Sequence, residues 1–292
     1  MNYIHSPMNY TGGKFKLLPK IIPLFPKDIR IFVDLFCGGL NVSVNVDCES
    51  VIANDVCSPV IKCYEYLSCY SFEDVRKEIM FRIAEFGLSD SDKESYFRLR
   101  RCYATFRKPL DLFLLSTMCF NNQIRFNSRG EFNMSYGERL YNDSIEQNLK
   151  AFMDALHNRK YTFLNGDFQN PEIVCNLDEN DFVYCDPPYM LSNAAYNTGW
   201  SEQDSIRLLE FLDILDDHGI RFALSEVLEH KGMVNEYLKK WSSKYRTEFL
   251  DIDYGGCSYH RSLKQSATVE VLVCNYETDK KSVVEERQME LF

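Results

Sequence analysis

Short apolar runs, most of them followed by glycine or an acidic residue, recur along the chain. They predict β-strands at residues 31–33, 51–53, 161–164, 182–185, 220–224 and 269–273. Glycine or acidic residues follow four of these runs, at 34–39, 54–55, 166–168 and 186–189. Strands that end in this way, with helices between them, are typical of a parallel sheet that binds a nucleotide-like ligand. The pattern therefore predicts an α/β fold.

The middle of the chain follows a different pattern. Residues 57–118 have mostly helical periodicity, whereas residues 119–140 are polar and rich in Asn, Arg and Gly, which predicts a loop or hairpin. Helical spacing is clearest at 72–86, 95–106, 142–157 and 206–215. The chain is therefore expected to divide into a split α/β domain, a mostly helical insertion that carries a β-hairpin, and a charged tail, at residues 1–57 with 159–276, 58–158 and 277–292.

Composition narrows the class of protein. Of the 292 residues, 45% are hydrophobic and 26% are charged, which is ordinary for a globular protein and excludes a disordered or fibrous one. Apolar runs of transmembrane length are missing, and the N-terminus has no apolar signal core, so we expect neither a membrane span nor a secretory signal. The 11 cysteines form no CxxC pair. We therefore expect reduced thiols in a cytoplasm, rather than a disulfide framework or a zinc site.

The amount and distribution of charge indicate which kind of partner the protein can bind. The net charge of −10 by itself argues against a nucleic-acid partner. The window 98–139, however, contains eight basic and three acidic residues, a local charge of +5. A basic surface on the predicted insertion is therefore compatible with an acidic partner such as DNA.

The strongest chemical signal is Asp186-Pro187-Pro188-Tyr189, directly after an apolar strand. Two prolines keep the chain extended and out of the sheet, which fixes an acid, a carbonyl and an aromatic ring at the strand's carboxyl end. Asp186 and the Pro187 carbonyl can accept both hydrogens of an exocyclic amine on a planar heterocycle, while Tyr189 stacks on the ring. The alternative is a simple Pro-Pro turn with a surface acid.

Two glycine-containing segments are candidate ligand turns. In 34–39, Gly38 and Gly39 allow close approach of a ligand, and an acid at the next strand end, in Asn54-Asp55, is placed to bind ribose hydroxyls. Segment 10–14 lacks the GxxxxGK[ST] phosphate pattern, so we interpret it as a glycine turn that presents Tyr10 and Lys14 to a ligand. The plain alternatives are an ordinary strand-to-helix turn and a helix start.

Several motifs together resemble a known family. SPMNYTGGKFKLLPKI, FVDLFCGGLNVSVN, IAND, NGDF and YCDPPY occur in the order of the Dam-type, alpha-class (D12) DNA adenine-N6 methyltransferases, and the enzymes of T-even phages look like the nearest group. The resemblance runs from about residue 6 to 276. It includes FNNQIRFNSRGEF, which is similar to the family's target-recognition loop, and also YNTGWSEQD and LEHKG.

The resemblance implies a Rossmann-like methyltransferase sheet with an inserted target-recognition domain, and S-adenosylmethionine as cofactor. By motif match, the cofactor-binding residues are Tyr10, Gly12, Gly13, Lys14, Asp34, Phe36, Gly38, Gly39, Asn54, Asp55, Asp167, Phe168 and Asp186. Tyr10 and Lys14 are expected at the methionine end, and Asp34, Phe36 and Gly38 at the amino-acid end. The ribose is assigned to Asp55, and the cofactor's adenine to Asp167 and Phe168.

The implied reaction is methylation of adenine N6 within GATC in double-stranded DNA. N6 is a poor nucleophile, and hydrogen bonds to Asp186 and the Pro187 carbonyl favour its pyramidal form, without a metal or a covalent intermediate. The base must first be flipped out of the duplex. Phe120 would wedge into the duplex, and Arg125 would bind a guanine through two hydrogen bonds. Further candidates for base or phosphate contacts are Asn121, Gln123, Asn127 and Arg129.

Some residues depart from the family pattern. Gln123, Ser135 and Asn9 bear on the recognition sequence, and Glu226 replaces the Asn of a Ser-Asn pair on a late strand. Two alternatives stay open: methylation of another amine (cytosine N4 or an RNA base), and a DNA-binding relative without catalysis. An Asp before Pro-Pro favours adenine.

Two short segments, residues 229–232 and 288–292, resemble further known motifs. Residues 229–232 match LEHKG, and we expect a helix start there rather than an acid-base site. The pentapeptide at the end of the sequence resembles the one with which bacterial proteins bind the sliding clamp, and its members are Gln288, Met289, Glu290, Leu291 and Phe292. We expect a bacterial or phage-encoded cytoplasmic enzyme whose role is restriction-modification, repair marking, regulation or phage protection.

Overall fold

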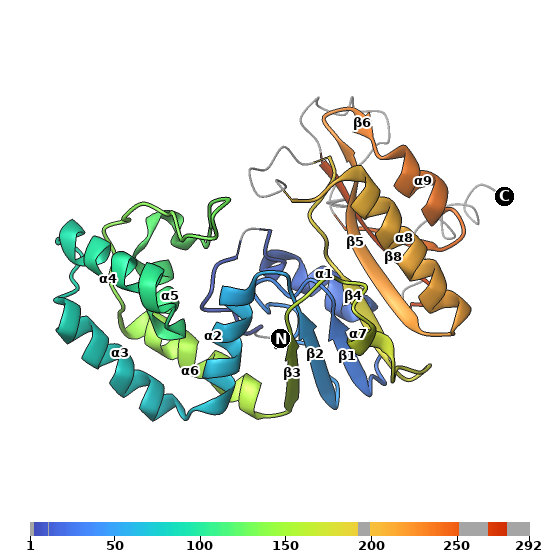
Figure 1. The fold of residues 1–292 in the computed structure, drawn as a ribbon. Helices are drawn as coiled ribbons and strands as arrows, with labels where there is room; N and C mark the ends of the chain where they lie inside the picture. Colours follow the sequence, from blue (N-terminus) through green and yellow to red (C-terminus); the bar gives the residue numbers. More distant parts are fainter. Residues whose placement is uncertain (1–2, 11, 192–198, 251–267, 279–292) are drawn as a thin grey trace, which may run out of the picture. The chain divides into compact units, whose positions relative to one another are not determined.

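The computed structural model describes residues 3–10, 12–191, 199–250 and 268–278. Contacts between Cα atoms divide the chain into two compact units. Unit 1 contains residues 1–15, 37–46 and 50–167. Unit 2 contains residues 16–36, 47–49 and 168–292. Each unit is described by itself below, with the element labels of Figure 1.

Unit 1 joins a parallel strand pair to a group of helices. Strands β2 (Ser50–Asn54) and β3 (Lys160–Leu164) pair in parallel over their whole length. The helices that lie between them in the sequence are α2 (Ser58–Cys69), α3 (Phe72–Phe86), α4 (Lys93–Phe106), α5 (Pro109–Met118), the 3-10 turn η3 (Phe120–Asn122) and α6 (Asp143–His157). Helix α2 packs against β3, so the helical part continues directly from the strand pair (Figure 1).

Helix α5 is the core of the helical part. All of its residues from Leu110 to Met118 are buried, because the helix is apolar on every side and contacts α2, α3 and α4. Its one buried carboxylate, Asp111, accepts two hydrogen bonds from Arg82 of α3, at 2.8 Å and 2.7 Å. This two-point ion pair joins α3 to α5 in the interior.

The surrounding helices begin and end where local chemistry predicts. The side chain of Ser71 caps α3 by accepting from the backbone N–H of Asp74, and Gly87 ends the helix with a φ of +58°. Asp92 caps α4 and Asn142 caps α6 in the same way. These caps explain why helical spacing in the sequence located α3 and α6 accurately.

Unit 2 contains a mixed sheet. Among the described residues its strands are ordered β1 (Ile31–Asp34), β4 (Phe182–Cys185), β5 (Arg221–His230), β8 (Thr268–Cys274) and β7 (Arg246–Phe249), and β6 (Met233–Val234) pairs with β5. Strands β1, β4 and β5 are parallel, whereas β8 is antiparallel to β5 and to β7. The short helices of this unit are η1 (Phe15–Leu17, which begins in unit 1), α1 (Leu18–Ile21), η2 (Ile22–Leu24) and α7 (Pro171–Val174). Helix α8 (Glu202–Asp217) packs on β5, and α9 (Glu236–Ser242) follows β6.

The sequence-based expectations can now be compared with this fold. The α/β class is confirmed, and each of the six predicted strands is present. The strand-end pattern indicated a parallel sheet, but β7 and β8 make it mixed. Strand β7 was missed because its residues, Arg-Thr-Glu-Phe, contain a single apolar side chain. The division into a catalytic domain and an inserted recognition domain stays a prediction.

One local expectation was wrong. Glu229 and His230 are the last residues of β5 rather than a helix start, and they pair with Val234 and Met233 of β6. Lys231 and Gly232 form the two-residue turn between these strands, with φ angles of +52° and +79°. Two consecutive left-handed residues reverse the chain into a hairpin and therefore cannot begin a helix.

Other features of the described residues are quickly stated. No helix in this part of the chain has both the length and the apolar character of a membrane span. The cysteines found there are free thiols, and no group of His, Cys, Asp and Glu within the same residues is arranged to hold a metal ion. Residues 288–292, which resemble the clamp-binding pentapeptide, lie outside the described residues.

Candidate functional site

In unit 2 two acids stand at the carboxyl ends of adjacent strands. Asp34 is the last residue of β1, is buried, and lies opposite Tyr184 of β4. Asp186 directly follows β4 and is half-buried. Burial, and then the carboxylates of Asp34 and Asp186, raise the pKa of the Cys185 thiol that precedes Asp186. Both acids therefore lie close to Cys185, at the carboxyl ends of β1 and β4.

Tyr189 closes the Asp-Pro-Pro-Tyr motif and is held by a distant strand. Its hydroxyl donates a hydrogen bond to Oε1 of Glu270 on β8. Burial, followed by the charges of Asp186 and Glu270, raises the pKa of Tyr189, so the hydroxyl stays protonated. Deeper in the sheet, the Tyr184 hydroxyl bonds to Ser225 Oγ of β5 at 2.9 Å. The chain before and after Asp186 is thus tied to two further strands.

Three aromatic rings gather in the same unit. The ring centroids of Phe36, Phe168 and Trp200 lie 5.5 to 5.7 Å from one another. The guanidinium of Arg207 lies over Phe168, 5.1 Å from the ring centre. The sequence predicted Phe36 and Phe168 as ligand contacts from separate motifs, and unit 2 brings them together.

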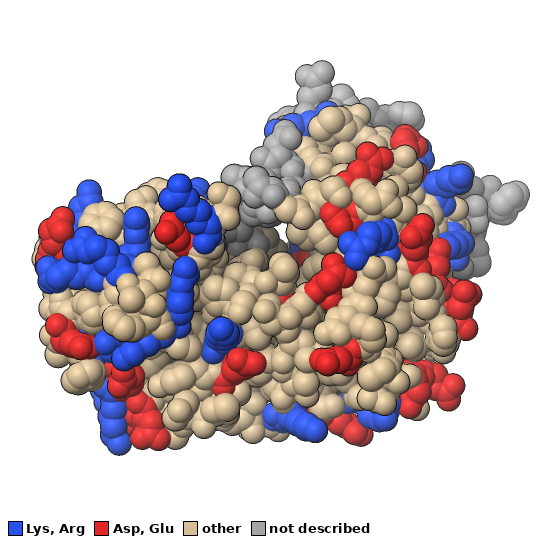
Figure 2. Space-filling view, viewed as in Figure 1, with Lys and Arg blue, Asp and Glu red and all other residues tan. Residues whose placement is uncertain are grey.

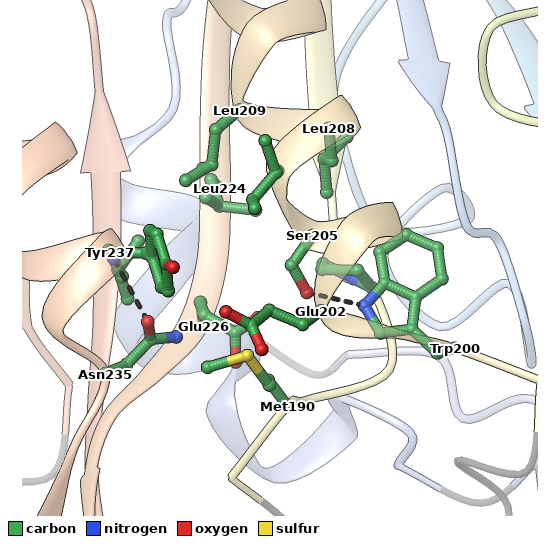
Figure 3. Close-up of a pocket in the computed structure, with 13 residues that line it drawn as sticks. Met190, Trp200, Glu202, Ser205, Leu208, Leu209, Leu224, Glu226, Asn235 and Tyr237 are labelled. Carbon is green, nitrogen blue, oxygen red and sulfur yellow. Dashed lines mark hydrogen bonds between the residues drawn. The ribbon is translucent and has the colours of Figure 1, made fainter.

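A small pocket lies beside the motif (Figure 3). Pro187 and Met190 line it, together with Trp200, whose indole N–H donates to Ser205 Oγ at 2.9 Å. Glu226, the departure from the family's Ser-Asn pair, also lines this pocket, and its Oε1 accepts a hydrogen bond from the backbone N–H of Val227 at 2.8 Å. Glu226 therefore lies in the wall of the same pocket as Pro187 of the motif.

In unit 1 the glycine turn is bonded to the end of β2. The backbone N–H of Gly38 donates to Oδ2 of Asp55 at 2.9 Å, and that of Cys57 donates to Oδ1 at 2.8 Å. Asp55 is buried, and burial raises its pKa against the effect of these two donors. Asn54, also buried, donates from its amide to the carbonyl of Gly166 at 3.2 Å. The carboxylate of Asp55 is therefore fixed at the carboxyl end of the strand.

The segment around Tyr10 packs on this turn. A Cβ atom added to Gly38, which has a φ of +42°, would lie 3.2 Å from Cδ1 of Tyr10. Cβ atoms on Gly13 and Gly39 would lie 3.2 and 3.0 Å from the side-chain amide of Asn41. Lys14 is buried, while Gly12 is exposed with a φ of +85°. Close packing in unit 1 therefore explains the glycines at 13, 38 and 39.

The predicted recognition residues lie on an exposed segment, residues 119–139. Phe120 is 57% exposed, and Asn121 and Asn122 follow it with φ angles of +57° and +55°. Isolated bridges join Cys119 to Tyr136 and Phe126 to Phe132, so the segment folds back on itself as a hairpin. Basic side chains gather over α4 and this segment (Figure 2).

Individual recognition candidates differ in how they are held. Arg125 is exposed, and its Nε donates to Oδ1 of Asn133 at 2.9 Å. Asn127 is occupied within the hairpin turn, where it accepts from the backbone N–H groups of Arg129 and Glu131. Arg129 is exposed at that turn. Arg125 and Arg129 thus present cations to solvent, whereas Asn127 closes the turn.

The N-terminal segment reaches the recognition segment within unit 1. The side-chain amide of Asn9 donates to the carbonyl of Asn121 at 3.0 Å, and Asn9 forms a parallel bridge with Gln123. Two of the departures from the family pattern are therefore neighbours.

Sequence reasoning missed three residues of these sites. Asn41 lies within FVDLFCGGLNVSVN but was not singled out, and Glu270 carried no motif signal, because single polar residues in a strand are common. Trp200 was signalled only by its place in YNTGW. Asp167, which directly precedes Phe168 in the sequence, is exposed.

Comparison with known proteins supplies the family. The model of the D12 class N6 adenine-specific DNA methyltransferases matches residues 10–254. Type II methyltransferase M.FokI of Planomicrobium okeanokoites is 41% identical over 283 residues, which cover 94% of this chain and 43% of that protein. Modification methylase StsI of Streptococcus sanguinis is 40% identical over 286 residues, with the same shares of each chain.

A third relative matches over most of its own length. Type II methyltransferase M.MjaIII of Methanocaldococcus jannaschii is 31% identical over 245 residues, which cover 75% of this chain and 82% of that protein. This chain spans 43% of M.FokI and of StsI.

The expectation that the T-even phage enzymes are the nearest group is wrong, since modification methylases match nearly the whole chain at about 40% identity. The chain belongs to the D12 class of N6 adenine-specific DNA methyltransferases, a family whose fold and chemistry imply S-adenosylmethionine as the methyl donor.

Proposed function

We propose that this chain methylates adenine N6 at a specific sequence in double-stranded DNA. The observation that carries the proposal is the Asp186-Pro187-Pro188-Tyr189 motif at the carboxyl end of β4, beside Asp34. A strand end is rigid, and the prolines keep the acid, the Pro187 carbonyl and the Tyr189 ring in one arrangement. That arrangement matches the amine and the face of a flipped adenine.

The motif acts on the target amine by hydrogen bonding and placement. Asp186 and the Pro187 carbonyl accept the two N6 hydrogens, which localises the nitrogen lone pair and directs it away from the ring. Tyr189 stacks on the base and holds its plane. Fixed acceptors aimed at the developing charge, together with correct placement, supply most of the rate. Transfer to cytosine N4 or to an RNA base remains an outcome for the test.

Unit 1 and unit 2 each contain residues of a kind that suits the cofactor that the family implies. S-adenosylmethionine, when bound, supplies an already activated sulfonium methyl group. A carboxylate has about four acceptor positions, and two backbone N–H groups occupy two of those on Asp55, which leaves acceptors for ribose hydroxyls. The half-buried ring of Phe36, which packs on the buried ring of Phe168, offers an apolar surface to the purine or the methionine chain.

The remaining cofactor contacts follow the family motifs. We assign Asp34, Gly38 and Gly39 to the amino-acid end and Asp167 to the adenine. Further proposed contacts are Tyr10, Gly12, Gly13, Lys14 and Asn54. Asp186 contributes to the cofactor site as well as to the target site.

DNA reading is assigned to the exposed recognition segment. Arg125 binds a guanine through its guanidinium, and Phe120 occupies the space that the flipped base leaves. Asn121, Gln123 and Arg129 contact base edges or phosphates, and Asn127 shapes the turn. GATC is the family's expectation for the recognition sequence, and Gln123, Ser135 and Asn9 are the departures that could change it.

The relatives suggest the biological setting. M.FokI is named a type II methyltransferase and StsI a modification methylase, so we propose that this chain protects DNA from a partner restriction enzyme. Free thiols and a DNA substrate favour a cytoplasmic location. We retain sliding-clamp binding by residues 288–292 as a proposal from the resemblance, and deletion of those residues with unchanged clamp binding would overturn it.

The test is methylation-sensitive long-read sequencing of DNA from a methylase-free host that expresses the chain, beside a host that expresses Asp186→Ala. N6-methyladenine at one sequence, absent with the variant, is the expected result and identifies the recognition sequence. If cytosine or RNA is modified instead, the same mechanism acts on another amine. No modified base in DNA or RNA would favour a DNA-binding relative without catalysis.

A further inference from the structure

Glu270 lies far from every family motif in the sequence, yet it contacts the last residue of the Asp-Pro-Pro-Tyr motif. The Tyr189 hydroxyl donates to its Oε1 across 81 positions of the chain. Both side chains are partly buried in unit 2. We propose that Glu270 is a positioning residue for methyl transfer, which fixes the ring of Tyr189 against the target adenine. This inference rests on the proposed function.

The backbone of Glu270 is well anchored. Strand β8 is paired on both sides, with β5 and with β7. Glu270 lies opposite Val227 of β5, next to a register shift in that ladder, and one residue beyond Val271, which forms the last pair with β7. On the other side, its carbonyl accepts a hydrogen bond from the backbone N–H of Leu250 at 2.9 Å. The next four residues, 271–274, are buried. A carboxylate on such a strand has a fixed origin and can serve as a reference point for a neighbouring side chain.

Tyr189, in contrast, lies outside the strand. Strand β4 ends at Cys185, and the prolines at 187 and 188 prevent the motif from continuing the sheet ladder. A tyrosine side chain has two rotatable torsions, so its backbone alone does not decide where the ring lies. A hydroxyl-to-carboxylate hydrogen bond is about twice as strong as a neutral one and restrains both torsions.

The residues of the motif therefore hold different parts of the target base. Asp186 and the Pro187 carbonyl hold the two hydrogens of the amine, whereas Tyr189 holds the face of the base. If the ring turns away, N6 is no longer aimed at the methyl group even though its hydrogen-bond acceptors are intact. Small misplacements of this kind lower the rate of transfer more than the affinity for substrate.

Four variants of the full chain test the inference in steady-state methylation of duplex DNA that contains the recognition sequence. We expect Glu270→Ala to lower kcat about 10- to 100-fold, as the loss of a hydrogen bond to a charged group does, with little change in the KM for S-adenosylmethionine. Glu270→Gln keeps an acceptor and is expected to retain most of kcat. Tyr189→Phe keeps the ring, loses the donor, and is expected to match Glu270→Ala.

The double variant Tyr189→Phe/Glu270→Ala is decisive. If Glu270 acts through the tyrosine hydroxyl, the double variant is no slower than either single variant. Losses that multiply would overturn the inference, as would equal losses in Glu270→Ala and Glu270→Gln. Glu248→Ala, which removes a carboxylate bonded to Arg246 on the neighbouring β7, is the matched control and is expected to leave kcat unchanged.

The outcomes also separate the two proposals. A wild-type chain that methylates adenine but shows multiplying losses overturns the role of Glu270 alone. A wild-type chain without adenine methylation overturns the proposed function, and the role of Glu270 in it as well.

Discussion

The catalytic motif (residues 186–189) and the recognition segment (residues 119–139) are held in opposite ways. The motif follows a strand that is buried at every position, and its tyrosine is bonded to β8. The recognition segment is exposed at its tip, turns through two left-handed asparagines, and has isolated bridges in place of a ladder. Many of its hydrogen bonds are internal, such as that from Arg125 to Asn133.

The difference follows from what each region must do. Methyl transfer needs atoms that are fixed to a fraction of an ångström. The carboxyl end of a paired, buried strand provides such fixed positions. Reading a DNA sequence needs hydrogen-bond donors that are bound to water in the free protein and to DNA in the complex. Exposed side chains on a short hairpin provide such donors. The hairpin is still tied to a scaffold, because the Tyr96 hydroxyl of α4 donates to the carbonyl of Met134 at 2.8 Å. Substitutions in the motif should therefore change rate, and substitutions in the hairpin should change substrate choice.

The largest effect is expected in the scaffold under the recognition segment. Asp111→Ala leaves the buried guanidinium of Arg82 without its two-point partner, and we expect the free energy of unfolding to fall by about 3–5 kcal/mol. Urea denaturation measures the change. The exposed pair of Lys77 and Asp74 is the control, and Lys77→Ala should cost less than about 1 kcal/mol. Similar losses for both variants would mean that the buried pair does not hold α3 to α5.

The second prediction concerns the motif. Asp186→Asn keeps the size of the side chain but removes the charge and one acceptor, and we expect kcat to fall about 10²- to 10³-fold. Single-turnover methylation measures the loss, and unchanged DNA affinity and unfolding temperature would show that the defect is chemical. An active Asp186→Asn enzyme would contradict the role assigned to this acid.

The third prediction addresses the recognition segment. Arg125→Ala should leave kcat on the cognate duplex within a few fold but reduce discrimination at one guanine by about 1–3 kcal/mol, roughly 5- to 150-fold. Competing duplexes that differ at that base pair measure the ratio. Arg101→Ala, on the exposed surface of α4, is the control and should weaken all duplexes alike. Equal losses on both duplexes with Arg125→Ala would make it a phosphate contact.

The smallest effect is expected at the contact between the N-terminal segment and the hairpin. Asn9→Asp has nearly the same shape but cannot donate to the Asn121 carbonyl, and we expect the KM for DNA to rise about 2- to 10-fold, as for one exposed hydrogen bond. Asn9→Ser, a shorter donor, is the comparison variant. A large fall in kcat with Asn9→Asp would place Asn9 in the chemistry rather than in the turn.

The sequence predicted the regular elements well where local forces decide them. Apolar runs located β4 at its observed residues, and helical spacing with Ser71 and Gly87 as caps located α3. The pattern failed where pairing came from distant segments. Strand β7 is polar and exists because it pairs with β8, and Lys231-Gly232 became a hairpin turn once β5 continued past residue 224.

The same division applies to the sites. Asp186-Pro187-Pro188-Tyr189 and the Gly38 turn were visible in the sequence, because prolines and glycines act on their own backbone and their chemistry is local. Only the tertiary structure brought together Tyr189 and Glu270, Asn9 and Asn121, and the amide of Asn41 and Gly13. These contacts cross tens of residues, and their side chains meet only after the sheet and helices have determined the path of the backbone between them.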